Sequence, residues 1–246
     1  MKETAAIILA AGAGTRMKSE LPKVAHRVMD KPMVNWVIDA LHQADVSRIV
    51  SIVGYGRDVV LPLVQADTTP AVQEQQLGTA HAVLCARDAL ADFDGSVLVL
   101  CGDCPLITAQ TLHQMCNLRE AEDAAVVVLT MVEENPFGYG RIVRDADGQV
   151  LRIVEEKDAS EEERAITECN SGFYCFDARA LFDALGRVGS NNAQGEFYLT
   201  DVLEIARLDK RKVLALQTSD ATECLGVNTP EQLAEAEEHM QKRMAC

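Results

Sequence analysis

Short, almost wholly apolar segments alternate with segments of helical periodicity through the first half of the sequence. AAIILA (5–10), RIVSIV (48–53) and SVLVLCGD (96–103) carry too few polar residues to expose a face to water. Such segments are typical of strands buried on both sides. Between them, MVNWVIDALHQA (33–44) and TAQTLHQMCNLREAED (108–123) place apolar residues at helical spacing. This alternation predicts an α/β fold with a mostly parallel sheet and helices on both faces.

The pattern changes after about residue 124. RIVRDADGQVLRIVEE (141–156) predicts a hairpin that turns at Asp147–Gly148, and SGFYCFD (171–177) predicts another strand. No low-complexity linker and no repeat interrupts the chain, so residues 1–246 are expected to form a single domain, with β-hairpin additions in its second half. Further helices are expected at 57–65, 78–93, 178–185, 198–208 and 230–244.

Composition excludes several classes of protein. Hydrophobic residues make up 48% of the chain, too many for intrinsic disorder, yet no apolar run is long enough to span a membrane. Eight cysteines without framework spacing, and a start unlike a signal peptide, lead us to expect reduced thiols in a cytoplasm. The formal charge of −15 argues against a nucleic-acid polymer as partner, although not against small phosphorylated ligands.

A glycine-rich stretch, LAAGAGTRMKSELPK (9–23), follows the first expected strand. Glycines let backbone N–H groups approach phosphates closely. The dinucleotide fingerprint needs a third glycine where Met17 stands, and the G-K-[ST] ending of a P-loop is absent. Pro22 interrupts any regular helix, so Lys23 can turn back toward the loop beside Arg16. The stretch therefore predicts backbone donors, a guanidinium and an ammonium that converge on a polyphosphate.

The same stretch is basic within an acidic chain. Its five cations are Arg16, Lys18, Lys23, Arg27 and Lys31. A solvated face is the simpler explanation of such an island, but its coincidence with the glycine loop favours a phosphate site.

The loop resembles the signature L-x-x-G-x-G-T-R-M, followed by L-P-K, of the sugar-1-phosphate nucleotidyltransferases. The resemblance covers nearly the whole chain and is strongest to the uridylyltransferase (pyrophosphorylase) half of the bacterial bifunctional N-acetylglucosamine-1-phosphate uridyltransferases. It implies the Rossmann-like fold of the nucleotide-diphospho-sugar transferases. The motifs that carry it are QEQQLGTAHA (73–82), LCGDCPLI (100–107), GYGRIV (138–143), IVEEKDA (153–159), ECNSGFY (168–174), NNAQGEFYLTD (191–201) and GVN (226–228).

The resemblance also implies roles for individual residues. Arg16 and Lys23 would be catalytic and would neutralise the phosphates in the transition state. Asp103 and Asn228 would bind Mg²⁺, an ion that takes few protein ligands. The nucleotide would contact Leu9, Ala10, Ala11, Gly12, Gln73, Gly78 and Thr79. The acetamido sugar would lie against Gly140, Glu155, Asn170, Tyr198 and Thr200.

Taken singly, several of these residues have simpler explanations. Asp103 would serve as a helix cap, Asn228 as a turn residue and Gln73 as a surface amide. Cys101 and Cys104 form a C-x-x-C, the pattern of a thiol redox pair, whereas one such pair does not complete a zinc site.

The reaction implied by the resemblance is transfer of UMP from UTP to N-acetyl-α-glucosamine 1-phosphate, which gives UDP-N-acetylglucosamine and pyrophosphate. The alternatives are another pairing of nucleotide and sugar, such as thymidylyl or uridylyl transfer to glucose 1-phosphate, and a non-catalytic UDP-sugar sensor. The bifunctional enzymes continue into a left-handed β-helix that transfers acetyl groups. No hexapeptide repeat is present, so no β-helix acetyltransferase domain is expected here, and the sequence does not distinguish a stand-alone enzyme from a trimmed one.

Overall fold

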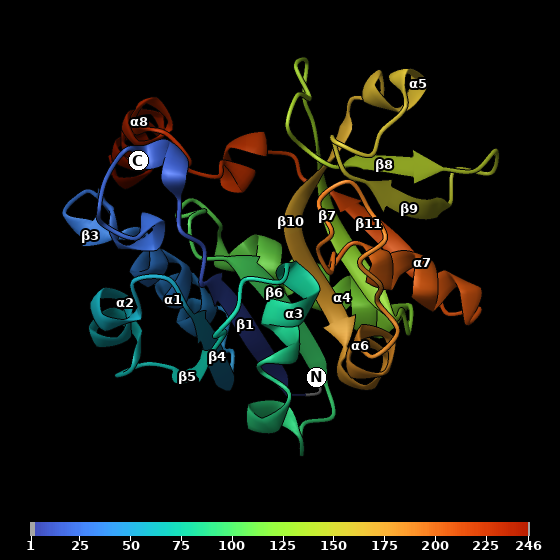
Figure 1. Ribbon diagram of the computed structural model, residues 1–246, viewed down its shortest axis with the longest axis horizontal. Coiled ribbons are helices and arrows are strands. Elements are labelled where there is room, and N and C mark those ends of the chain that lie inside the picture. The colour runs from blue at the N-terminus through green and yellow to red at the C-terminus, as the bar shows by residue number, and fades with distance from the viewer. Residues whose placement is uncertain (1–2, 246) are drawn as a thin grey trace.

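A computed structural model of the protein describes residues 3–245 and has a mixed sheet at its centre (Figure 1). The main strand order is β11-β7-β10-β6-β1-β4-β5, and β8 and β9 form a hairpin attached to β10. Strands β6, β1, β4 and β5 run parallel to one another, as the apolar segments predict. These four strands are β1 (Thr4–Ala10), β4 (Arg48–Val53), β5 (Thr69–Val72) and β6 (Ser96–Cys101).

The second half of the chain extends this sheet with antiparallel pairing. Strand β10 lies antiparallel to both β6 and β7, whereas β11 lies parallel to β7. The hairpin turns at Gly148, whose φ of +78° favours glycine, so the predicted turn is confirmed. The strands of this half are β7 (Val126–Val132), β8 (Arg141–Arg144), β9 (Val150–Val154), β10 (Glu168–Asp177) and β11 (Val213–Gln217).

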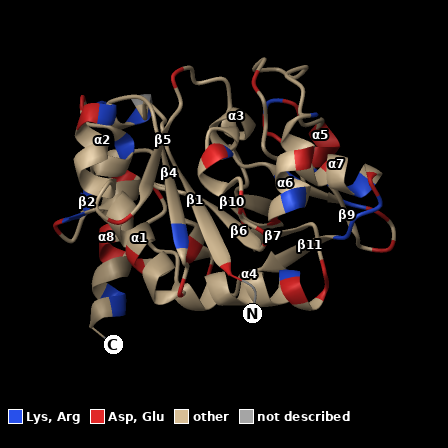
Figure 2. Ribbon diagram, turned by 90° about the horizontal axis from the view of Figure 1, so that it is seen from below, with Lys and Arg blue, Asp and Glu red and all other residues tan. Residues whose placement is uncertain are grey.

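Helices cover both faces of the sheet. One face buries apolar side chains of α1 (Met33–Gln43), α2 (Arg57–Val64) and α4 (Ala109–Ala121). The other packs against α3 (Thr79–Leu84), α6 (Ala178–Leu185) and α7 (Asp201–Leu208). Charged residues lie mainly on these helices and on the loops, while the central strands are largely uncharged (Figure 2). The predicted α/β layering is therefore confirmed.

Two helices lie apart from these layers. The last, α8 (Pro230–Met244), begins with proline as expected and packs against the segment after β1 through a third, smaller apolar cluster that includes Met17, Val28 and Val227. The short α5 (Glu161–Arg164) starts with a capping box between Ser160 and Glu163.

The helix expected over 78–93 is wrong in its length. The structure ends α3 at Leu84 and follows it with a separate 3₁₀ turn, Asp88–Leu90. Arg48 donates a hydrogen bond to the carbonyl of Ala89 at 3.3 Å, so this oxygen is satisfied by a side chain rather than by a continuing helix. The helix expected over 198–208 begins only at Asp201.

The sheet order places a crevice at the carboxyl ends of β1 and β6. From β1 the chain adds β4 and β5 on one side, and then crosses over to add β6 on the other. Neighbouring strands whose connections leave in opposite directions open a crevice between their carboxyl ends, where ligands bind in open α/β sheets. None of the helices in the described part of the chain is long and apolar enough to cross a membrane.

Candidate active site

The loops after β1 and β6 meet in the crevice. The backbone N–H of Gly102 donates a 3.0 Å hydrogen bond to the carbonyl of Leu9. A Cβ on Gly102 would lie 3.2 Å from that oxygen, so glycine permits the close approach. The glycine loop and Asp103 are thereby held at neighbouring strand ends.

Lys23 turns back against the glycine loop, as the sequence predicts. Pro22 has extended backbone angles and precedes the short 3₁₀ turn Lys23–Ala25. Gly14 has a φ of +61°, and a Cβ there would lie 2.5 Å from the Cβ of Lys23. Only glycine at position 14 lets the lysine pack this closely.

The ammonium of Lys23 lies between the two residues expected to hold a metal. It forms an ion pair with Asp103 and donates a hydrogen bond of 2.9 Å to Oδ1 of Asn228. Arg16 Nη2 donates to the same Oδ1 at 2.8 Å. Burial alone would lower the pKa of Lys23, but the Asp103 carboxylate outweighs it and raises that pKa, so the ammonium stays charged. Four side chains that the sequence singles out thus form one cluster.

Two other cations of the basic island contact residues outside this cluster. Lys31 pairs with Asp39 and lies 4.6 Å from the centre of the Trp36 ring. Arg27 donates to the carbonyl of Asp30. The island therefore divides into the site pair Arg16 and Lys23 and, apart from it, Arg27 and Lys31, which contact other parts of the fold.

The oxygens of Asp103 and Asn228 suit a magnesium ion that shares its shell with phosphates. Both already contact one cation, the Lys23 ammonium, so both reach a common point. Within residues 3–245, no three His, Cys, Asp or Glu side chains gather into a preformed metal cage. Mg²⁺ commonly takes one or two protein ligands and completes its shell with water and substrate oxygens.

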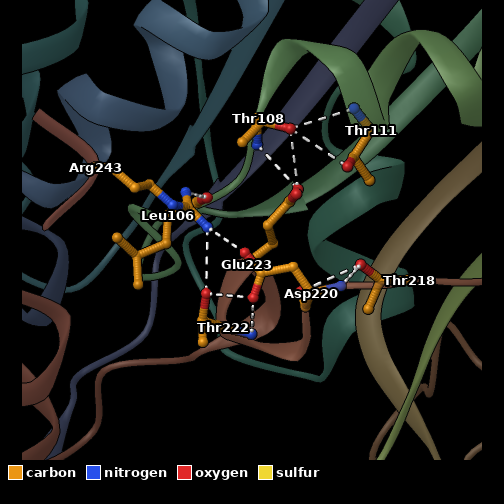
Figure 3. A network of polar contacts seen from close by, with 8 residues as sticks. All are labelled: Leu106, Thr108, Thr111, Thr218, Asp220, Thr222, Glu223 and Arg243. Atoms are coloured by element: carbon orange, nitrogen blue, oxygen red, sulfur yellow. Dashed lines mark hydrogen bonds and ion pairs between the residues drawn. The ribbon is translucent and has the colours of Figure 1, made fainter. Parts of the chain in front are cut away.

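A buried carboxylate joins the two chain segments that carry this pair (Figure 3). Glu223, which is 8% exposed, accepts hydrogen bonds on Oε2 from the backbone N–H and the hydroxyl of Thr108, at 3.2 and 3.1 Å. Further along, the N–H of Val227 donates to the carbonyl of Asp103 at 3.0 Å. The segment leading to Asn228 is therefore held against the segment after β6.

Arg243, near the end of α8, adds further hydrogen bonds between these two segments (Figure 3). Its guanidinium donates to the carbonyl of Leu106, to Asp220 at 3.0 Å and to Thr222 at 3.2 Å. Burial would raise the pKa of Asp220, but hydrogen bonds from Thr222 and Arg243 outweigh it and lower that pKa.

A cavity of about 280 Å³ lies beside the cluster, and most of the residues expected to contact the nucleotide line it. Ala10 does not, because it is 1% exposed and packs on the opposite face of the sheet from Leu9. The expected residues in the lining are Leu9, Ala11, Gly12, Gln73, Gly78 and Thr79, with Lys23 and Asp103. Sequence reasoning did not single out Gln76 and Glu196, which also line it, and considered Cys101 only as part of a thiol pair, although each lies in a quoted motif.

The segment 191–201 forms one wall of this cavity. Phe197 exchanges backbone hydrogen bonds with Leu77 and Ala80, at 2.8 and 2.9 Å. Gly78, with a φ of +118°, passes so close to Phe197 that a Cβ would lie 2.5 Å from its carbonyl oxygen. The hydroxyl of Thr79 accepts from the N–H of Leu199 at 2.9 Å. These contacts bring the two motifs together in space.

Glu155 lines a second, larger cleft of about 950 Å³ that also reaches Arg16. Burial raises the pKa of Glu155, Asp158 and Asp201 raise it further, and a 3.3 Å hydrogen bond from Thr200 opposes the rise. A Cβ on Gly140 would lie 3.5 Å from the Glu155 carboxylate. Three of the residues expected at the sugar therefore lie together.

The other two residues expected at the sugar are engaged within the protein. Asn170 Oδ1 accepts from the N–H of Gly172 at 3.0 Å, and its amide lies 2.8 Å from the hydroxyl of Tyr174. The hydroxyl of Tyr198, which is 8% exposed, accepts from Gln194 at 2.8 Å and donates to Asp158 at 3.3 Å. Their contact with a sugar remains a prediction.

A model of the family described as nucleotidyl transferase matches residues 5–243. The chain belongs to the nucleotidyl transferase family. Bifunctional protein GlmU of Geobacter sulfurreducens is 50% identical over 100% of this chain and 52% of its own length. Bifunctional protein GlmU of Bacillus subtilis is 49% identical over 99% of this chain and 54% of its own length. The chain thus spans about half the length of these curated relatives.

Solved structures share the fold of this chain. UDP-glucose pyrophosphorylase complexed with UDP-glucose superimposes with a TM-score of 0.78 at 19% identity, over 99% of this chain and 100% of that chain. A putative glucose-1-phosphate thymidylyltransferase from Bacillus anthracis gives 0.76 at 22% identity, over 96% and 94%. The predicted fold class is confirmed.

The C-x-x-C of this nucleotidyl transferase does not resemble a redox pair. Both cysteines are free, and Cys104 is buried. A hydrogen bond with Cys101, together with burial, raises the pKa of the Cys104 thiol well above its usual range. A redox pair needs an accessible thiolate, which these surroundings disfavour. Cys101 instead lines both the cavity of about 280 Å³ and an adjoining cavity of about 230 Å³ that reaches Asn228.

Proposed function

We propose that this nucleotidyl transferase transfers UMP from UTP to N-acetyl-α-glucosamine 1-phosphate and releases pyrophosphate. The observation that carries the proposal is the convergence of Arg16, Lys23, Asp103 and Asn228 at the carboxyl ends of β1 and β6. Two cations beside two oxygen ligands suit a reaction in which negative charge shifts among phosphates. The identity of about 50% to the GlmU proteins supports this choice of substrates.

The chemistry asks little of the protein beyond position and charge. The sugar phosphate oxygen attacks the α-phosphorus of UTP, the bond from that phosphorus to the bridging oxygen breaks, and pyrophosphate leaves. The attacking phosphate is already ionised, so no general base is required. Arg16 and Lys23 would hold the phosphates and neutralise their oxygens. Asp103 and Asn228 would hold Mg²⁺, which supplies further positive charge when bound.

The acceptor sugar would occupy the cleft that Glu155 lines. A carboxylate accepts hydrogen bonds from sugar hydroxyls, and a hydrogen bond from Thr200 holds this one, with Gly140 close by. Arg16 lines the same cleft and also the cavity that contains Asp103 and Asn228. A sugar 1-phosphate in the cleft would therefore direct its phosphate toward the four-residue cluster.

Pyrophosphate release tests the proposal directly. UTP, dTTP, CTP and ATP would each be combined with N-acetylglucosamine 1-phosphate or glucose 1-phosphate, with Mg²⁺ and with chelator. We expect release from UTP with N-acetylglucosamine 1-phosphate, and its loss on chelation. Release only from another pair would support the proposed reaction type but contradict the proposed substrates. Silence across all combinations would contradict catalysis and favour a sensor that binds UDP-sugar.

A further inference from the structure

The amide of Gln73 is held by two neighbours inside the nucleotide cavity. Gln73 follows β5, is 4% exposed and lines the cavity. Its Nε2 lies 3.2 Å from the carbonyl oxygen of Gly78 and 3.0 Å from Nδ1 of His81. A carbonyl oxygen only accepts hydrogen bonds, so the NH₂ end of the amide must face Gly78.

His81 agrees with this orientation when its ring is neutral and carries its proton on Nε2. Nδ1 is then an acceptor for the second N–H of Gln73. Both N–H groups are then used, and Oε1 has no hydrogen-bond partner among residues 3–245. Oε1 is also absent from the described atoms that are both fully buried and unpaired, so a ligand can reach it. Gln73 therefore offers the cavity an acceptor.

An acceptor at this place distinguishes two pyrimidines. The N3 position of uracil carries a hydrogen and donates, whereas N3 of cytosine is an acceptor. Against Oε1 of Gln73, uracil would form a hydrogen bond and cytosine would place two acceptors face to face. Rotation of the amide would reverse the preference, because the NH₂ group would then face the base.

We propose that His81 is a positioning residue that fixes the Gln73 amide with Oε1 toward the base, and thereby selects UTP over CTP. The inference rests on the proposed function, in which this cavity receives the base. Both neighbours of the amide are themselves held. Gly78 is held by its close approach to Phe197, and His81 lies within α3. The orientation is thus set before a nucleotide arrives.

Three variants test the inference. His81→Ala removes the acceptor, and His81→Asn restores one, because Oδ1 of asparagine occupies nearly the place of Nδ1. His113→Ala is the control, since His113 lies on α4 and lines a different cavity. For each variant, kcat/KM would be measured with UTP and with CTP by pyrophosphate release, at saturating N-acetylglucosamine 1-phosphate.

We expect His81→Ala to lower the ratio of kcat/KM for UTP to that for CTP by roughly tenfold, the value of one hydrogen bond. The change should lie in KM, with kcat for UTP within about twofold of wild type, because the base is remote from the reacting phosphorus. His81→Asn should recover most of the ratio, and His113→Ala should keep it. A general loss of folded protein would lower both rates and leave the ratio unchanged.

Two results would overturn the inference. If the wild type prefers UTP and His81→Ala keeps the same ratio, His81 does not position the amide, while the proposed function stands. If the wild type turns over no nucleotide at all, the proposed function fails and the inference fails with it.

Discussion

Lys23 and Asn228, 205 positions apart in the sequence, are joined by a 2.9 Å hydrogen bond from Nζ to Oδ1. The bond connects the loop after β1 to the segment before α8, and the same ammonium pairs with Asp103. The expected phosphate clamp and the expected metal ligands are therefore one unit. Loss of Lys23 should affect phosphate binding and the arrangement of both oxygens at once.

Lys23→Met should lower turnover by about 10²–10³-fold, the usual effect of removing one group that stabilises transition-state charge. Lys31→Met is the matched control, because Lys31 belongs to the same basic stretch but pairs with Asp39. Initial rates of pyrophosphate release, with melting temperatures for both variants, would separate a catalytic loss from unfolding. Equal rates for the two variants would contradict the role given to Lys23.

Gly12→Ala should weaken nucleotide binding without disturbing the fold. A Cβ on Gly12 would meet no atom within 4 Å, yet the residue lines the cavity in which we propose that the nucleotide binds. The added methyl group would enter space that the ligand needs, so the Kd for UTP, measured by calorimetry, should rise about tenfold or more, on the scale of a lost close backbone contact. Gly189→Ala, also free of contacts, should bind UTP like the wild type. Unchanged affinity of Gly12→Ala would place the nucleotide elsewhere.

Local sequence patterns predicted most of the fold because the central strands are buried on both faces. The apolar runs that form β1, β4 and β6 are suited to strands that helices cover on both sides. The helix expected over 78–93 was too long: α3 ends at Leu84, and Arg48, distant in the sequence, donates a hydrogen bond to the carbonyl of Ala89 in the 3₁₀ turn that follows. Periodicity does not contain such a contact.

The site was less predictable than the fold. A local argument from Pro22 was enough to predict that Lys23 turns toward the loop. The contact of Lys23 with Asn228 depends instead on the order of the strands, and that of Gly78 with Phe197 on the return of a distant segment. Only the resemblance to a family linked these residues before the structure did.

Glu223→Ala should destabilise the protein and loosen the contacts that hold the segment of Asn228 against the segment after β6. The substitution removes the buried carboxylate that accepts from the N–H of Thr108 and leaves that partly buried N–H without its acceptor, which costs about 1–3 kcal/mol. Glu122→Ala is the control, because Glu122 forms an exposed pair with Lys212 that should contribute below about 1 kcal/mol. Urea unfolding of both variants gives the comparison. Equal free energies of unfolding would show that the Glu223–Thr108 contact adds nothing to stability.

Two neighbouring glutamates should give opposite dependences of stability on pH. Burial raises the pKa of Glu155, whereas a hydrogen bond from Arg141 outweighs burial and lowers that of Glu156. In the unfolded chain Glu155 loses its proton at a lower pH than in the folded chain. Its contribution to stability therefore falls as the pH rises above the usual glutamate pKa. The contribution of Glu156 is present above its unfolded pKa and is lost as the pH falls through its folded pKa.

Glu155→Gln should therefore raise the melting temperature relative to wild type, by a margin that grows from acid pH toward neutrality and then stays constant. Glu156→Gln should lower it, most at neutral pH and least in acid. Glu155→Gln should also lower kcat/KM for the sugar phosphate about 10–100-fold, the value of a hydrogen bond to a charged group. Melting curves between about pH 4 and 8, which include the range in which glutamates titrate, measure the direction of both changes in melting temperature. If Glu155→Gln melted below the wild type at neutral pH, the Glu155 carboxylate would be stabilised by a partner, and burial would not dominate its pKa as described above.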